Sequence, residues 1–149
     1  MKIGKLLLLI FSIAAFGTAS FAQSKTVINN VKAKNMLLGR HLLSLQWISW
    51  DRFGAANVTN KGGVFYLKGE QQKGSDFVKI DGAITSIDAD NFKFNGTITT
   101  KISHIANGAA CERTGEMTFV ITGKRKYWRL QEMQNPCDDV VDYVDVYFR

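Results

Sequence analysis

From residue 40 onward, apolar and polar side chains alternate along the chain with a period of two. Polar breaks, most of them glycine-containing, interrupt the alternation at short intervals. This pattern is typical of an antiparallel all-β domain. The expected strands cover residues 41–50, 53–59, 64–71, 77–87, 92–102, 116–122, 127–133 and 142–148.

Eight consecutive strands of this kind predict a closed antiparallel meander barrel. Gly69, Gly82 and Gly96 lie inside otherwise apolar strands, where glycine permits the strong coiling that closure requires. A meander barrel of this size resembles the calycin architecture shared by lipocalins and avidins. The Gly-x-Trp motif expected on the first strand of that architecture is absent, because Gly39 lies well upstream of Trp47. The resemblance is therefore one of architecture alone.

The apolar face of the hairpin 77–102 indicates how its strands pair. Placing residue 84 opposite residue 94 aligns apolar side chains from both strands on one face. Before the first strand, residues 24–39 lack alternation, and their apolar side chains predict a short helix that closes one end of the barrel.

The hairpin 116–133 has one register that groups its apolar side chains on a single face. In that register residue 119 lies opposite residue 130. A slip of one residue would turn every side chain to the other face. The same register predicts a bulge at Gly115, between the paired strands and the cysteines.

Residues 1–22 have the layout of a cleavable signal peptide. Lys2 and Lys5 precede an apolar run over residues 6–16, and small residues lead to Ala22. A retained membrane anchor is the alternative, but the uncharged stretch of 17 residues is shorter than the ~20 that a spanning helix needs. The sequence therefore predicts export to the periplasm or the outside medium, and a single domain over residues 23–149 that does not span the membrane.

The expected mature chain carries a mild positive charge. The full sequence has 19 basic and 13 acidic side chains, and removal of Lys2 and Lys5 leaves 17 against 13, a net charge of +4. This balance suits weak attraction to an anionic surface or polymer, and it is too small for a dedicated nucleic-acid binder. We expect no nucleic-acid partner, and a monomer or small oligomer.

Cys111 and Cys137 both fall in the expected mature chain. An even cysteine count in an oxidising compartment predicts one disulfide, and a pair of buried thiols is the alternative. The bridge would join the two long connections, residues 103–115 and 134–141, at the open end of the hairpin.

Aromatic side chains are frequent, and four of them are predicted to point into the barrel. Trp47, Phe94, Phe119 and Trp128 could line a cavity of several hundred Å³ for a small apolar or amphipathic ligand. The alternative is a barrel filled by its own side chains. The first functional hypothesis is therefore a non-enzymatic exported module that binds such a ligand.

The segment 123–129 combines cations with two aromatic residues at the tip of a hairpin. Its cations are Lys124, Arg125, Lys126 and Arg129. This composition suits an anionic glycan, protein or membrane surface, which gives the second hypothesis, a surface-interaction protein. The same charges would also keep a turn solvated and discourage edge pairing.

A hydrolytic enzyme is the third hypothesis. Both cysteines are assigned to the disulfide, and neither His41 nor His104 lies in a pattern that marks a catalytic base. One of them would have to contact a carboxylate and a hydroxyl in a cleft. We therefore favour a protein without catalytic activity and without a cofactor.

Four aspartates follow Cys137 closely, and their oxygens are of the type that binds calcium. They are Asp138, Asp139, Asp142 and Asp145. Their spacing matches no EF-hand loop, and the glycine of such a loop is missing. We therefore expect a solvated loop and no metal site.

Overall fold

The structure is a computed structural model and describes residues 23–148. The predicted signal peptide, residues 1–22, lies outside the described residues. The elements are β1 (Val27–Ile28), α1 (Val31–Leu37), β2 (Gly39–Leu45), β3 (Gly54–Lys61), β4 (Val64–Lys73), β5 (Asp76–Ile87), β6 (Asn91–Lys101), a 3₁₀ turn (Ala106–Gly108), β7 (Ala110–Val120), β8 (Tyr127–Leu130) and β9 (Val144–Tyr147).

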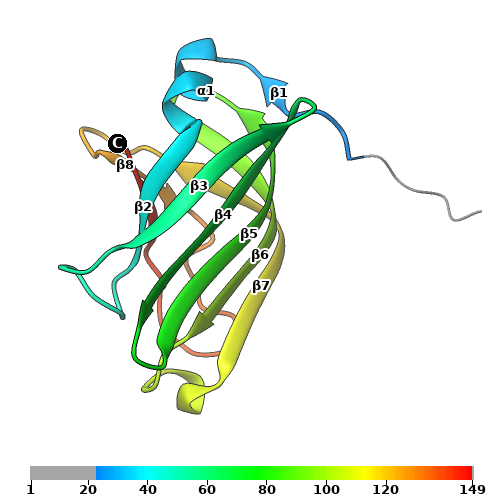
Figure 1. The fold of residues 1–149 in the computed structure, drawn as a ribbon. Coiled ribbons are helices and arrows are strands. Elements are labelled where there is room, and N and C mark those ends of the chain that lie inside the picture. The colour runs from blue at the N-terminus through cyan, green and yellow to red at the C-terminus, as the bar shows by residue number, and fades with distance from the viewer. Residues whose placement is uncertain (1–22, 149) are drawn as a thin grey trace, which may run out of the picture.

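Strands β2 to β9 pair antiparallel in chain order, and β9 pairs with β2 to close the sheet. The result is a closed eight-stranded meander barrel, which confirms the predicted fold (Figure 1). The short β1 pairs in parallel with the end of β5, at Val27 with Ser86. Each strand therefore connects to the next at alternating ends of the barrel, which we call the α1 end and the disulfide end.

The α1 end is closed by the helix that the sequence predicted. Asn30 caps α1, because its side chain accepts a hydrogen bond of 2.8 Å from the Ala33 backbone amide. Ala33 and Leu37 are buried against the core, so the helix contributes its apolar side chains to this end of the barrel. His41 fastens the helix, since its ring nitrogens lie 2.7 Å from the Leu37 carbonyl oxygen and 2.9 Å from that of Tyr147.

The predicted registers of both hairpins are confirmed. Ile84 pairs with Phe94 in the first hairpin, and Phe119 pairs with Leu130 in the second. The register of β5 and β6 shifts by one residue between Ile84 and Ser86, so the bulge of this sheet lies there.

The expected bulge at Gly115 is not found. Gly115 pairs with Gly96 in an uninterrupted ladder, and β7 begins at Ala110, six residues before the predicted strand. The sequence did not reveal this start, because Arg113 lies on the same face of β7 as the inward-pointing Met117 and Phe119. A charged side chain in that position breaks the expected alternation.

Two predicted strands are too long. β2 ends at Leu45 instead of residue 50, and the chain turns at once, with the Ile48 amide bonded to the Leu45 carbonyl. β8 ends at Leu130 instead of residue 133. The connection from β8 to β9 is therefore longer than expected, and it forms much of the disulfide end.

Glycines in neighbouring strands make room for one aromatic ring. Gly82 pairs with Gly96, and a Cβ atom built on Gly96 would lie 2.5 Å from Phe94 Cζ and 2.6 Å from the Gly82 Cα. No real side chain fits at those distances, so the close approach of the strands and the buried Phe94 ring depend on the glycine.

Gly96→Ala is expected to lower the free energy of unfolding by about 1 to 3 kcal/mol, because an overpacked core must shift backbone and side chains. Urea denaturation measures this loss. Asn95→Ala changes the exposed neighbour and should alter the free energy of unfolding by less than about 0.5 kcal/mol. Equal stabilities for the two variants would contradict the packing argument.

Candidate functional site

Three of the four aromatic residues predicted to bind a ligand lie together inside the barrel. Phe94, Phe119 and Trp128 are buried. The ring centroids of Phe94 and Phe119 are 6.2 Å apart, Phe92 stacks on Phe119 at 4.9 Å, and Phe92 lies 5.8 Å from Trp128. These rings pack against one another in the core.

Trp47 is separated from those three residues. It lies in the turn after β2 at the disulfide end and is partly buried against the core. Its indole N–H donates a hydrogen bond of 3.1 Å to Asp142 Oδ1, and its ring meets His104 edge-on at 6.0 Å. Trp47 therefore belongs to a polar network, which the sequence did not reveal.

Two of the pockets found among the described residues lie on the outer side of the barrel wall. One, of about 430 Å³, adjoins β2 and is lined by Arg40, His41, Leu42, Ala55 and Phe148. The other, of about 550 Å³, covers β4, β5 and β6, and ion pairs such as Lys68 with Asp81 cross it. The first is lined mainly by apolar atoms, and the second is bordered by charged and hydroxyl side chains.

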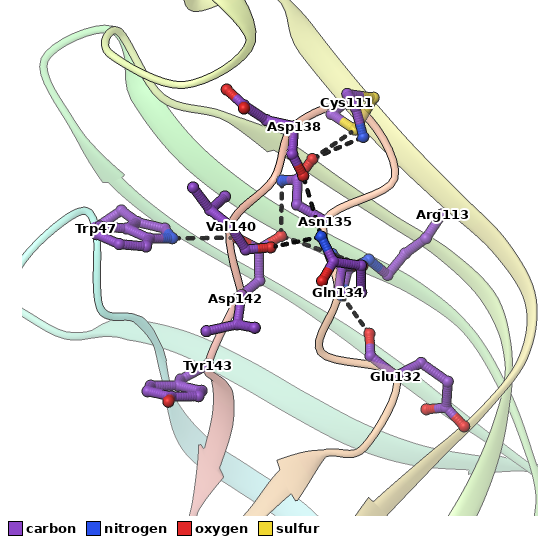
Figure 2. Close-up of polar contacts among 12 residues, drawn as sticks. Trp47, Cys111, Arg113, Glu132, Gln134, Asn135, Asp138, Val140, Asp142 and Tyr143 are labelled. Carbon is purple, nitrogen blue, oxygen red and sulfur yellow. Dashed lines mark hydrogen bonds and ion pairs between the residues drawn. A yellow bond between two sulfur atoms is a disulfide. The ribbon is translucent and has the colours of Figure 1, made fainter.

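The polar network at the disulfide end centres on the buried carboxylate of Asp142 (Figure 2). Arg113 Nη2 donates to Asp142 Oδ2 at 2.6 Å, and Asn135 Nδ2 donates to the same oxygen at 2.9 Å. Arg113 Nη1 also donates to the Glu132 carbonyl oxygen at 2.8 Å. Together with the Trp47 indole, these donors satisfy the carboxylate inside the protein.

Both partners of this ion pair are desolvated. Burial raises the pKa of the Asp142 carboxyl, although the charge of Arg113 opposes that rise. Burial likewise lowers the pKa of the Arg113 guanidinium against the charge of Asp142. Each buried charge is stabilised by the other, so the ion pair links β7, near the disulfide end, to the loop before β9.

The predicted disulfide between Cys111 and Cys137 is confirmed, with Cα atoms 6.0 Å apart. It connects β7 to the same loop that carries Asn135 and Asp142. Asn135 Oδ1 accepts a hydrogen bond of 2.8 Å from the Cys137 amide, so the bridge and the polar network brace one loop.

The aspartates after Cys137 have separate roles. Asp138 accepts a hydrogen bond of 2.7 Å from the Ala106 amide, which lowers its pKa. Asp142 pairs with Arg113, and Asp145 pairs with Arg129. Within residues 23–148, no group of three or more His, Cys, Asp or Glu side chains could hold a metal ion.

Arg129, one of the four predicted surface cations, is held in an ion pair on the outer wall. Its Nε and Nη2 donate to the two carboxylate oxygens of Asp145, each at 2.7 Å, and Asp145 is fully buried. This hydrogen bonding raises the pKa of Arg129. The rings of Tyr127 and Tyr143 lie 5.1 and 4.3 Å from the guanidinium. Arg129 therefore has its counter-charge within the barrel wall.

The other three predicted cations, Lys124, Arg125 and Lys126, are exposed at the tip between β7 and β8. The meander brings this tip to the α1 end, where the Ile121 amide bonds to the Asp90 carbonyl at 2.7 Å and the Phe148 amide bonds to the Lys126 carbonyl at 2.9 Å. Figure 1 shows α1, β1 and the start of β8 at the same end of the barrel.

Basic side chains gather at this α1 end. Among the described residues they are Lys25, Lys32, Lys34, Arg40, Lys61, Lys124, Arg125 and Lys126. The carboxylates there are Asp88 and Asp90, in the turn between β5 and β6. Eight cations against two carboxylates give a formal charge of +6, and we call these eight side chains the basic end.

The disulfide end has the opposite balance. Apart from the Arg113–Asp142 pair, its described carboxylates are Asp51, Asp76, Glu112, Glu132, Asp138 and Asp139, and its cations are Arg52, Lys73 and Lys101. Between the two ends, oppositely charged side chains pair across the strands, as Lys79 does with Glu70 and Lys93 with Glu116. The barrel is therefore electrically polar along its axis.

Comparison with known proteins gives a family that spans the barrel. The family described as the PM1083 family matches residues 25–148. The chain belongs to the PM1083 family. An uncharacterized protein, PM1083, of Pasteurella multocida (strain Pm70) is 47% identical over 117 residues, which cover 78% of this chain and 76% of the relative. No solved structure matches the chain.

Membership of the PM1083 family names no reaction. His41 contacts backbone carbonyls, and His104 contacts the edge of Trp47, so neither contact reproduces the pattern required by the hydrolase hypothesis. In the part of the chain that the structure describes, no helix is both long enough and apolar enough to cross a membrane.

Proposed function

We propose that this member of the PM1083 family is an exported, non-enzymatic binding module that docks an anionic partner on its basic end. The observation that carries the proposal is the collection of eight cations and two carboxylates at one end of the barrel. Such a field attracts anions and speeds their association.

The pairing of charges elsewhere supports this choice. Along the barrel wall, Lys68, Lys79 and Lys93 each face a carboxylate across a strand. The ion pairs found among the described residues do not use the cations of the basic end. A partner is the natural source of counter-charge for such a cluster.

Export is part of the proposal. The Cys111–Cys137 disulfide supports an oxidising compartment, and the layout of residues 1–22 supports delivery by a cleaved signal peptide. The periplasm and the outside medium both satisfy these conditions.

The hypothesis of an internal ligand has weaker support. Phe94, Phe119 and Trp128 are in a cluster of mutually packed rings, so a ligand among them would have to displace side chains. Native mass spectrometry of protein from its own host tests it directly, and a retained small apolar molecule would restore this hypothesis.

The test of the basic end uses a soluble polyanion, dextran sulfate, at several salt concentrations. The triple variant Lys124→Gln, Arg125→Gln, Lys126→Gln is expected to weaken binding at low salt. If all three cations contact the polymer, the slope of log Kd against log salt should fall by about 2 to 3.

A matched variant neutralises the same amount of charge on the barrel wall. Lys68→Gln, Lys79→Gln, Lys93→Gln removes three exposed cations that already face carboxylates. Its salt slope should stay close to that of the unmodified protein. If both triple variants lose binding equally, net charge alone explains the result and the proposal fails.

A further inference from the structure

We infer that the partner of the basic end is the surface of an anionic lipid bilayer, which the barrel meets end-on. This inference rests on the proposed function and adds the class of partner. It comes from the exposed apolar side chains that lie among the cations. The proposed function rests on the cations alone.

Exposed aliphatic side chains lie at this end of the barrel. Val27 is 55% exposed and Val31 is 63% exposed. Val27 follows Lys25 by two residues, and Val31 is the first residue of α1, next to Lys32. Figure 1 shows β1 and α1 together at this end. Aliphatic residues interspersed with lysines allow shallow insertion between lipid headgroups while the cations contact phosphates.

A third apolar feature lies on the barrel wall and extends from Arg40, near this end, to the middle of β2. Leu42 is 46% exposed and lines the outer pocket of about 430 Å³ with Ala55 and Phe148. Arg40 lines the same pocket, so a cation adjoins an apolar groove. That combination suits an anionic headgroup carrying an acyl chain.

The exposed apolar residues favour lipid over glycan. Sugar-binding sites commonly stack the sugar on an aromatic ring. At the basic end the ring of Tyr127 already faces Arg125 at 5.7 Å and Arg129 at 5.1 Å. The exposed large apolar side chains described there are aliphatic, and they have no hydrogen-bonding group for a sugar.

The charge at the opposite end would orient the barrel. Six carboxylates against three cations at the disulfide end are repelled by an anionic bilayer, whose surface potential falls off within a Debye length. The axial charge separation therefore favours contact through the basic end over contact through the wall.

The experiment measures partitioning of the exported protein, with its N-terminus verified by mass spectrometry, onto lipid vesicles. The vesicles contain phosphatidylcholine alone or phosphatidylcholine with phosphatidylglycerol. We expect sedimentation with the anionic vesicles only. The double variant Val27→Ser, Val31→Ser should partition about tenfold more weakly onto them, since two exposed valines lose their insertion.

Two comparisons separate this inference from the proposed function. Val27→Ser, Val31→Ser should bind dextran sulfate as the unmodified protein does, and its circular dichroism spectrum should be unchanged. Trp50→Ser, Val141→Ser removes exposed apolar side chains at the opposite end, where Trp50 is 57% and Val141 is 41% exposed, and should leave vesicle binding unchanged.

Each result has a definite consequence. Unchanged vesicle binding by the valine variant, or binding to dextran sulfate without binding to anionic vesicles, overturns the lipid inference and leaves the anionic-partner proposal standing. Equal binding to neutral and anionic vesicles also overturns it. Loss of the proposed function would appear separately, as dextran sulfate binding that does not depend on Lys124, Arg125 and Lys126.

Discussion

Replacing Arg113 with Met is expected to lower the free energy of unfolding by about 3 to 5 kcal/mol at neutral pH, because it leaves the buried Asp142 carboxylate without its cation. Asn135 and Trp47 still donate hydrogen bonds to that carboxylate, but neither carries charge. Urea denaturation followed by circular dichroism measures the loss.

The loss should depend on pH in a definite direction. Burial raises the pKa of Asp142 in the folded protein, and the opposing charge is absent in the variant. A carboxyl with a raised pKa binds more protons in the folded state than in the unfolded state, so its relative stability increases as pH falls toward about 4. The difference between Arg113→Met and the unmodified protein should therefore shrink from pH 7 to pH 4.

A double-mutant cycle provides the control. Asp142→Asn alone should also destabilise the protein, because it leaves the guanidinium unpaired at 10% side-chain exposure. The combination Arg113→Met, Asp142→Asn should recover much of the loss, since neither charge is then buried alone. Strictly additive losses, with no change between pH 7 and pH 4, would show that the two charges are not coupled.

The barrel was predictable because its pattern is local. Alternation along each strand placed residues such as Phe94 and Ile98 inside, and the apolar faces gave both hairpin registers without other information. The start of β7 was missed because Arg113 occupies an inward position. Its partner, Asp142, lies 29 residues later in a loop, where no periodic signal marks it.

The candidate site was only partly predictable. Composition alone identified Lys124, Arg125 and Lys126, but it also included Arg129, whose partner Asp145 lies directly opposite on β9. That pairing depends on the register of β8 and β9, and the long connection between these two strands leaves their register undefined by side-chain alternation.

The basic end itself required the topology. Lys32, Lys34 and Lys61 are remote in sequence from the hairpin tip, and they join it because a meander returns alternate turns to the same end. The net charge of the expected mature chain is a mild +4. When the charged side chains are instead grouped by the end of the barrel at which they lie, the two ends have net charges of opposite sign. The exposure of Val27 and Val31 depends on how β1 and α1 pack against the barrel, which the periodicity of the sequence does not define.

Removing the disulfide with Cys111→Ala, Cys137→Ala is expected to lower the free energy of unfolding by about 3.5 kcal/mol, because the bridge closes a loop with a sequence separation of 26 and thereby restricts the unfolded chain. Urea denaturation of the oxidised protein, the reduced protein and the double variant measures this loss. Reduction must be carried out in denaturant, since Cys111 is buried.

The reduced protein and the double variant should have similar stability, and reductant should not change the variant. Protein made in the cytoplasm without residues 1–22 should resemble the reduced form until it is oxidised, because the cytoplasm keeps thiols reduced. Equal stability of the oxidised and reduced protein, with both thiols shown to be alkylated after reduction, would mean that the bridge contributes nothing to stability.

The loop that carries Asn135 and Asp142 would then be held by the Arg113 network alone, and the loss of stability from Arg113→Met should be the same with and without the disulfide. If the disulfide and the Arg113 network instead stabilise this loop together, the losses of stability from Arg113→Met and from removal of the disulfide should be non-additive, since both act on one loop.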